Sequence, residues 1–146
     1  MKTFILFLAC CSMYLGAFSQ PPTRDGAVPE MVLQNFQKEF PQARLLNWDR
    51  SGNSFVARFV LNGFNERAYF STAGIWLYTD IDIPTAKTDK IPEKAMNHFK
   101  SSYPGYRILN AGYRDAPSGS YYYLEVTRGG ERRTLRYDDF GKYLLN

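Results

Sequence analysis

The chain has 146 residues, a net charge of +4 and two cysteines. Its length suits one domain or two small interdependent halves. The basicity is mild and both signs of charge are interleaved along the chain, which disfavours a nucleic-acid partner.

The first residues have the pattern of a secretory signal peptide, which we assign to residues 1–19. Lys2 precedes an apolar run from Phe4 to Gly16, and the small residues Ala17 and Ser19 occupy the recognition positions of a cleavage site. The run is shorter than the roughly 20 apolar residues that a membrane span needs. We therefore expect cleavage after Ser19, a periplasmic or secreted protein, and no integral membrane segment in the mature chain.

Other interpretations of this segment stay open. The apolar run could be a buried helix or a membrane anchor, and Leu8-Ala9 before Cys10 could form a lipid-attachment motif, although Phe7 suits that motif poorly. Cleavage after Ser19 would remove both cysteines, so the mature protein would fold without disulfides and depend on its core. Residues 20–27 are predicted to be a flexible leader.

The rest of the sequence contains one pattern twice. Residues 28–47 correspond to residues 91–110, with Val-Pro-Glu answered by Ile-Pro-Glu and Phe-Pro answered by Tyr-Pro. A duplicated pattern predicts a duplicated architecture. The predicted parts are a first repeat, an exposed connector and a second repeat, at residues 28–83, 84–90 and 91–146.

Each repeat is predicted to begin with an amphipathic helix. The apolar stripes, at helical spacing, are Val32, Phe36 and Phe40 in the first repeat, and Ala95, Phe99 and Tyr103 in the second. Pro29 suits the first helical position. Pro41 and Pro104 are expected to end the helices, because a residue before proline disfavours helical backbone angles.

After each helix the hydrophobic period changes to two, which is typical of strands. Phe55, Ala57 and Phe59 alternate with other residues and are followed by Asn62-Gly63, a strong hairpin signal. The second repeat places Gly129-Gly130 at the equivalent turn. The predicted fold class is α+β: two tandem repeats, each one helix followed by a four-stranded antiparallel meander, with the helices on one face of the sheet. Whether the two repeats pack on each other stays open.

This arrangement resembles the PepSY-like proteins of Bacteroidetes, whose fold is similar to that of β-lactamase-inhibitory protein. The resemblance covers about Val28 to Asn146 and rests on the tandem Val/Ile-Pro-Glu and Phe/Tyr-Pro helices, each followed by four strands. It implies an exported, non-enzymatic domain that binds or inhibits a partner. It assigns no individual binding residue.

The sheet face that points away from the helices is the candidate binding surface. Alternation places tyrosine, tryptophan and arginine there, the residue types enriched at interface hot spots. The candidate partner-binding residues are Arg58, Tyr69, Trp76, Tyr78, Tyr121, Tyr123, Arg136 and Tyr143. The same residues could instead form cross-strand pairs that stabilise a solvated sheet.

No motif typical of catalysis or metal binding is found. His98, the single histidine, is assigned to a solvated position on its helix. Asp80 and Asp82 could ligate calcium, but aspartates that form turns are the commoner case. We expect no enzymatic activity, no cofactor and no metal.

The predicted function is binding of a protein or peptide partner, with inhibition of that partner as one form of it. A small-molecule or glycan binder that stacks ligands on the same rings is an alternative. A structural envelope protein without a discrete ligand is another. The sequence predicts no oligomeric state.

Overall fold

The computed structural model describes residues 27–145. The predicted signal peptide, its cleavage position and nearly all of the predicted leader lie outside the described residues. The elements, in chain order, are α1 (Glu30–Glu39), β1 (Arg44–Ser51), β2 (Ser54–Leu61), β3 (Phe64–Ser71), β4 (Trp76–Ile83), the 3-10 helix η1 (Thr85–Lys90), α2 (Glu93–Ser102), β5 (Arg107–Asp115), β6 (Tyr121–Arg128), β7 (Glu131–Tyr137) and β8 (Tyr143–Leu144).

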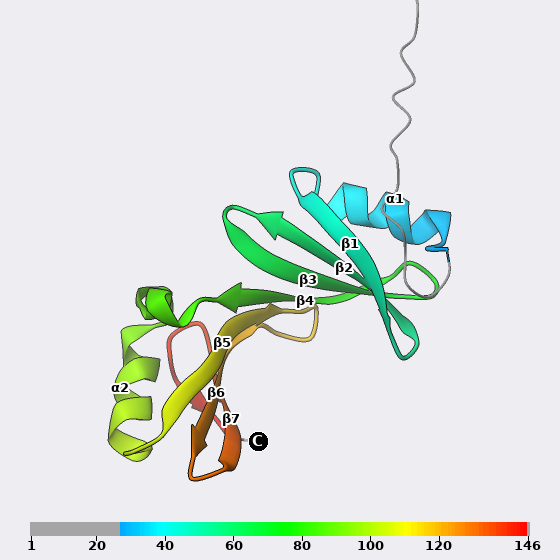
Figure 1. Ribbon diagram of the computed structural model, residues 1–146. Helices are drawn as coiled ribbons and strands as arrows, with labels where there is room; N and C mark the ends of the chain where they lie inside the picture. The colour runs from blue at the N-terminus through cyan, green and yellow to red at the C-terminus, as the bar shows by residue number, and fades with distance from the viewer. Residues whose placement is uncertain (1–26, 146) are drawn as a thin grey trace, which may run out of the picture.

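The eight strands form one antiparallel sheet in which every strand pairs with its neighbours in the chain. Strands β4 and β5 join the two meanders, because residues 79–83 pair with residues 111–115. Each meander has its own helix, α1 or α2, and the two lie towards opposite ends of the sheet (Figure 1). The predicted fold class is confirmed, and the repeats are fused edge to edge rather than stacked face to face.

The helices begin and end beside the prolines. Pro29 and Pro92 have extended backbone angles and occupy the N-cap, one position before the one predicted for Pro29. Phe40 and Tyr103 leave helical geometry immediately before Pro41 and Pro104, as predicted.

Two hydrophobic cores lie between the helices and the sheet. The first is rich in aromatic rings and includes Trp48, Phe59 and Phe70 beneath α1. The second includes Leu124 and Tyr137 beneath α2. Phe55, Ala57 and Phe59, whose alternation predicted a strand, are buried, and so are Phe70, Leu124, Val126 and Leu135 on neighbouring strands.

The duplication extends to irregularities in the strands. The register of β1 against β2 shifts between Leu45 and Asn47, and that of β5 against β6 shifts between Ile108 and Asn110. These positions correspond in the two repeats. Since a bulge bends and twists a strand, each meander is curved at the same place, close to the helix of its own repeat.

The fourth strand of each meander differs from the prediction. Trp76 pairs with buried Phe70, and Tyr143 pairs with buried Tyr137. Both side chains therefore lie on the side of the helices and pack against the two cores. The assignment of Trp76 and Tyr143 to the outward face is wrong.

The physical reason is the length of the turn before each fourth strand. Ser71 donates its backbone N–H to the carbonyl of Ile75, and Asp138 makes the equivalent bond in the second repeat. The length of a turn fixes the register of its hairpin. Trp76 and Tyr143, the residues that follow the acceptors Ile75 and Lys142, therefore face the core. In β4 an extra residue, Leu77, then returns Tyr78 to the outward face.

His98 is also placed differently from the prediction. Its Nδ1 lies 3.1 Å from the hydroxyl oxygen of Tyr137, and its ring stacks on that of Tyr143 with centroids 4.8 Å apart. The side chain is half-buried. His98 is therefore part of the packing between α2 and the sheet, and the solvated assignment is wrong.

Glu66 is a charged side chain within the helix-facing layer. It is only 7% exposed and pairs across the strands with Phe59 and Ile81. Burial, followed by the negative charge of Asp115, raises the pKa of its carboxyl from 4.5 to about 7. The native state then holds this proton more tightly than the unfolded chain does. Stability should therefore be highest below about pH 4.5 for this group and should fall as the pH rises to about 7.

The variant Glu66→Gln should remove this loss. At pH 8 we expect its free energy of unfolding to exceed that of the wild type by at most about 3 kcal/mol, from 1.36 kcal/mol per pKa unit. At pH 4.5 the two should be nearly equal. Urea unfolding at both pH values measures the difference. Glu39→Gln, at an exposed helical position, is the matched control, and a gain that is equal at both pH values would contradict the explanation.

Candidate binding surface

The sheet face opposite the helices carries a row of charged and aromatic side chains across five strands. Register places the row on successive strands from β2 to β6, at Arg58, Arg67, Asp80, Arg114 and Tyr121. Because facing residues in neighbouring strands have side chains on the same face, these groups are brought together by strand pairing alone.

Aromatic rings and guanidinium groups alternate over this face. The ring centroids of Tyr69 and Tyr78 lie 4.2 Å apart, and the Arg114 guanidinium lies 4.1 Å from the Tyr78 centroid. Tyr121 lies between two guanidiniums, 6.0 Å from that of Arg114 and 5.3 Å from that of Arg136. We call these five residues the aromatic–arginine ladder. Cation–π contacts of this kind hold each group in place against its neighbour.

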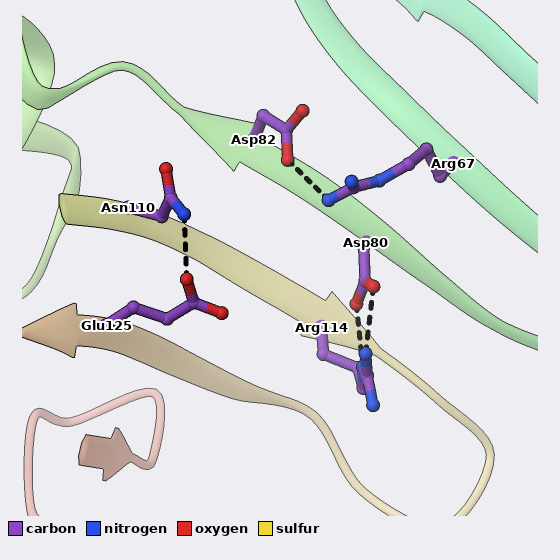
Figure 2. A network of polar contacts seen from close by, with 6 residues as sticks. All are labelled: Arg67, Asp80, Asp82, Asn110, Arg114 and Glu125. Atoms are coloured by element: carbon purple, nitrogen blue, oxygen red, sulfur yellow. Dashed lines mark hydrogen bonds and ion pairs between the residues drawn. The ribbon is translucent and has the colours of Figure 1, made fainter. Parts of the chain in front are cut away.

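Ion pairs bind two of the arginines to the same face (Figure 2). Arg114 donates from Nε and Nη2 to the two carboxylate oxygens of Asp80, at 2.6 and 2.8 Å. Arg67 donates from Nη2 to Asp82 Oδ1 at 2.7 Å. The bond to Asp80 raises the pKa of the Arg114 guanidinium, so Arg114 stays charged. Burial raises the pKa of Asp82, and the nearby charge of Asp80 acts in the same direction.

Asp80 and Asp82 lie within β4 and not in a turn. The prediction that they form turns is therefore wrong, and their partners explain their presence in a strand. Asp80 is buried and satisfied by a two-bond contact with Arg114. Within the described residues, no group of three or more His, Cys, Asp or Glu side chains could hold a metal ion.

Tyr123 lies flat against the sheet over Gly112. A Cβ atom at Gly112 would overlap the Tyr123 ring and stand 2.7 Å from the Ile81 carbonyl oxygen. Glycine therefore leaves the space that the ring occupies. Burial and the charges of Asp80 and Asp82 raise the pKa of Tyr123 to about 12, so its hydroxyl stays protonated at neutral pH.

Hollows open on this face, and two of them contain Arg67. The first has a volume of about 280 Å³, and its lining includes Arg67, Arg114, Tyr121 and Arg136. The second has a volume of about 530 Å³ and extends towards the turn between β2 and β3. Both are lined by Arg67, Tyr123 and Glu125. Asn110 donates to Glu125 at 2.7 Å, which holds that carboxylate against β5 (Figure 2).

The structure brings six of the eight candidate residues together on the outward face. They are Arg58, Tyr69, Tyr78, Tyr121, Tyr123 and Arg136. Arg58 lies at the edge of the group, where it forms an ion pair with Asp49. Trp76 and Tyr143 lie on the other face, as described above.

Sequence reasoning missed Arg114 and the role of Asp80. Arg114 stands at the centre of the aromatic–arginine ladder, between two tyrosines from different repeats. Alternation along β5 could have placed it outward, because the neighbouring Tyr113 packs against the second core. The pairing of β4 with β5, which sets Asp80 opposite Arg114, could not be predicted from either repeat alone.

A protein-family model described as "Putative beta-lactamase-inhibitor-like, PepSY-like" matches residues 53–144. The chain belongs to this PepSY-like family. The match spans the strands that carry the ladder, and it confirms the family resemblance found in the sequence. No curated protein matches the chain.

Several solved structures from Bacteroides species are similar to this chain. A BLIP-like protein from Bacteroides fragilis has a TM-score of 0.74 and 19% identity, with 82% of this chain and 85% of that chain covered. A DUF2874 family protein from Bacteroides uniformis has a TM-score of 0.72 and 22% identity, with 82% and 88% covered. A "putative periplasmic" protein from Bacteroides eggerthii has a TM-score of 0.70 and 24% identity, also with 82% and 88% covered. At these identities the likeness shows a shared fold.

None of the helices in residues 27–145 has the length and apolar character needed to cross a membrane.

Proposed function

We propose that this protein is an exported, non-enzymatic binding protein that engages a protein or peptide partner through the outward sheet face. The observation that carries the proposal is the aromatic–arginine ladder. Both helices pack on the opposite face of the sheet, so neither helix of residues 27–145 covers the ladder. Tyrosine and arginine give large contact area with polar groups and dominate binding energy at protein interfaces.

The family and its structural neighbours support this proposal. The family description refers to β-lactamase inhibitors, and the Bacteroides fragilis neighbour is a BLIP-like protein. Inhibition of a secreted or periplasmic enzyme is therefore one form that partner binding would take. The signal-peptide pattern and the "putative periplasmic" neighbour from Bacteroides eggerthii support export.

A small molecule or glycan bound on the same face is the second candidate. The hollow of about 530 Å³ favours it, because pockets for small ligands have volumes of roughly 300–1,000 Å³. Its lining combines the Tyr123 ring with polar groups such as Asn65 and Asn110, and such a combination suits a polar ligand that stacks on an aromatic ring.

A pull-down from the envelope and secreted fractions of the host tests the proposal. The wild-type protein is used as bait and compared with the double variant Tyr69→Ala/Tyr121→Ala, which removes two of the three aromatic rings of the ladder. Phe140→Ala, whose side chain is 84% exposed and belongs to the turn before β8, is the matched control. All three are checked for folding by thermal unfolding.

A protein retained by the wild type and by Phe140→Ala, but lost with the double variant, would support partner binding through the ladder. The same protein should then bind in purified form. Retention by all three baits would place the interface elsewhere. Retention of no protein, together with a glycan that binds the wild type only, would favour the second candidate.

A further inference from the structure

We infer that the Arg136 end of the aromatic–arginine ladder receives an acidic side chain from the protein partner. The inference rests on the proposed function and specifies the chemistry that the face recognises. The occupant is a carboxylate of aspartate or glutamate in a peptide segment, held beside Tyr121 in the hollow of about 280 Å³.

Arg136 differs from the other two arginines of this hollow in its partners. Arg67 and Arg114 are each neutralised by an aspartate of β4. In the part of the chain that the structure describes, no ion pair joins Arg136 to a carboxylate. Its side chain is exposed, and its contact with the Tyr121 ring does not engage a carboxylate. Arg136 is therefore the arginine of the ladder that is available to an outside anion.

The contact with Tyr121 also prepares Arg136 for a carboxylate. A guanidinium over an aromatic face keeps its N–H donors at its edge, where they match the two oxygens of a carboxylate. Tyr121 is itself held from its other side by Arg114. Because the ladder restricts Arg136 before binding, less conformational entropy is lost when the carboxylate binds.

The two carboxylates that line the hollow are each bonded to another residue of the sheet. The lining of the hollow contains three arginines against two carboxylates, those of Asp80 and Glu125. Both oxygens of Asp80 accept bonds from Arg114, and Glu125 accepts a bond from Asn110. Glu125 keeps its negative charge, because the Asn110 amide is neutral, but in the described residues neither Glu125 nor Asp80 forms an ion pair with Arg136. The Arg136 guanidinium is therefore the group of the hollow that is left to bind an outside carboxylate.

The size of the hollow favours an inserted side chain. Its volume of about 280 Å³ lies just below the range of roughly 300–1,000 Å³ for pockets that enclose whole small ligands. When a peptide inserts one side chain into this hollow, the backbone of the peptide would lie over the neighbouring strands. The tyrosines of the ladder would then provide the contact area around the charge.

A library of random dodecapeptides displayed on phage, selected on the immobilised protein, tests this inference. We expect the retained peptides to be enriched in aspartate and glutamate relative to the unselected library. One retained peptide is then synthesised in two forms. The first keeps its acidic residue, and in the second this residue is replaced by the corresponding amide, glutamine for glutamate or asparagine for aspartate. The acidic form should bind the wild type about tenfold more tightly than the amide form.

Variants on β7 locate the site. Arg136→Gln should abolish the preference for the acidic form, while Arg132→Gln should leave its affinity within about twofold of the wild type. Arg132 is the matched control because it lies four residues away on the same strand and face. It lines a separate hollow of about 210 Å³ whose lining does not include Arg136. Both changes remove one positive charge, so a general effect of net charge would appear in both. Thermal unfolding checks that each variant is folded.

Three results would overturn the inference and leave the proposed function intact. They are retained peptides without an excess of acidic residues, equal weakening by the two β7 variants, and competition by free glutarate as effective as by the acidic peptide. Competition of the last kind would identify a site for small dicarboxylates. No retained peptide and no partner in the pull-down would overturn both proposals together.

Discussion

Replacement of Phe36 by alanine should destabilise the protein by about 3–5 kcal/mol, the range for truncation of a buried aromatic side chain. Phe36 is 5% exposed and lies in α1 at the centre of the first core. Its ring contacts those of Phe40, Trp48, Phe59 and Phe70, with centroid distances from 5.3 to 6.4 Å. Alanine would leave a cavity bounded by four rigid rings that cannot collapse to fill it.

Urea unfolding followed by circular dichroism measures this loss. Phe99→Ala, at the equivalent position of α2, is expected to fall in the same range. Phe140→Ala removes an equally large ring from an exposed position and should change the free energy of unfolding by less than about 0.5 kcal/mol. A loss below about 1 kcal/mol for Phe36→Ala would show that the ring is not packed as described.

The repeated sequence predicted the architecture because each signal occurred twice. The apolar stripe that contains Phe36 and the one that contains Phe99 have the same spacing and are each ended by a proline. Alternation along β2 predicted a strand whose residues Phe55, Ala57 and Phe59 lie in the first core, since this strand runs without a bulge against β3. For these elements local pattern and tertiary structure agree.

The outward face was harder to predict because it depends on register between strands. Trp76 and Tyr143 were misplaced together, since the two repeats share the turn that sets their register. Because the two repeats have the same pattern, a wrong assignment in one repeat recurs in the other. The pairing of β4 with β5 has no counterpart within a repeat, so Arg114 and its partner Asp80 could be brought together only by the structure.

Replacement of Arg114 by alanine should destabilise the protein by about 2–4 kcal/mol. Asp80 is 5% exposed, and Arg114 supplies both hydrogen bonds to its carboxylate. Removal of one partner of a buried ion pair leaves an uncompensated charge, which costs roughly 3–5 kcal/mol when both partners are fully buried. We expect somewhat less here, because the Arg114 side chain is 32% exposed and water can enter the space that it leaves.

The two partners of this pair should not be equivalent. Asp80→Ala leaves a guanidinium that still contacts the Tyr78 ring and can reach solvent, so it should cost less than Arg114→Ala. The double variant, which has neither charge, should be more stable than Arg114→Ala alone. Urea unfolding of the three variants and the wild type forms a double-mutant cycle that measures the coupling between the two residues.

The double variant separates the charge of Arg114 from its stacking. Without the guanidinium, the Asp80 carboxylate, which is 5% exposed, loses the donor of both its hydrogen bonds to Arg114 and becomes a buried charge without that partner. Removal of this carboxylate as well should therefore restore part of the stability lost in Arg114→Ala. A double variant no more stable than Arg114→Ala would mean that Arg114 stabilises the sheet through its stacking on Tyr78 and not through its charge.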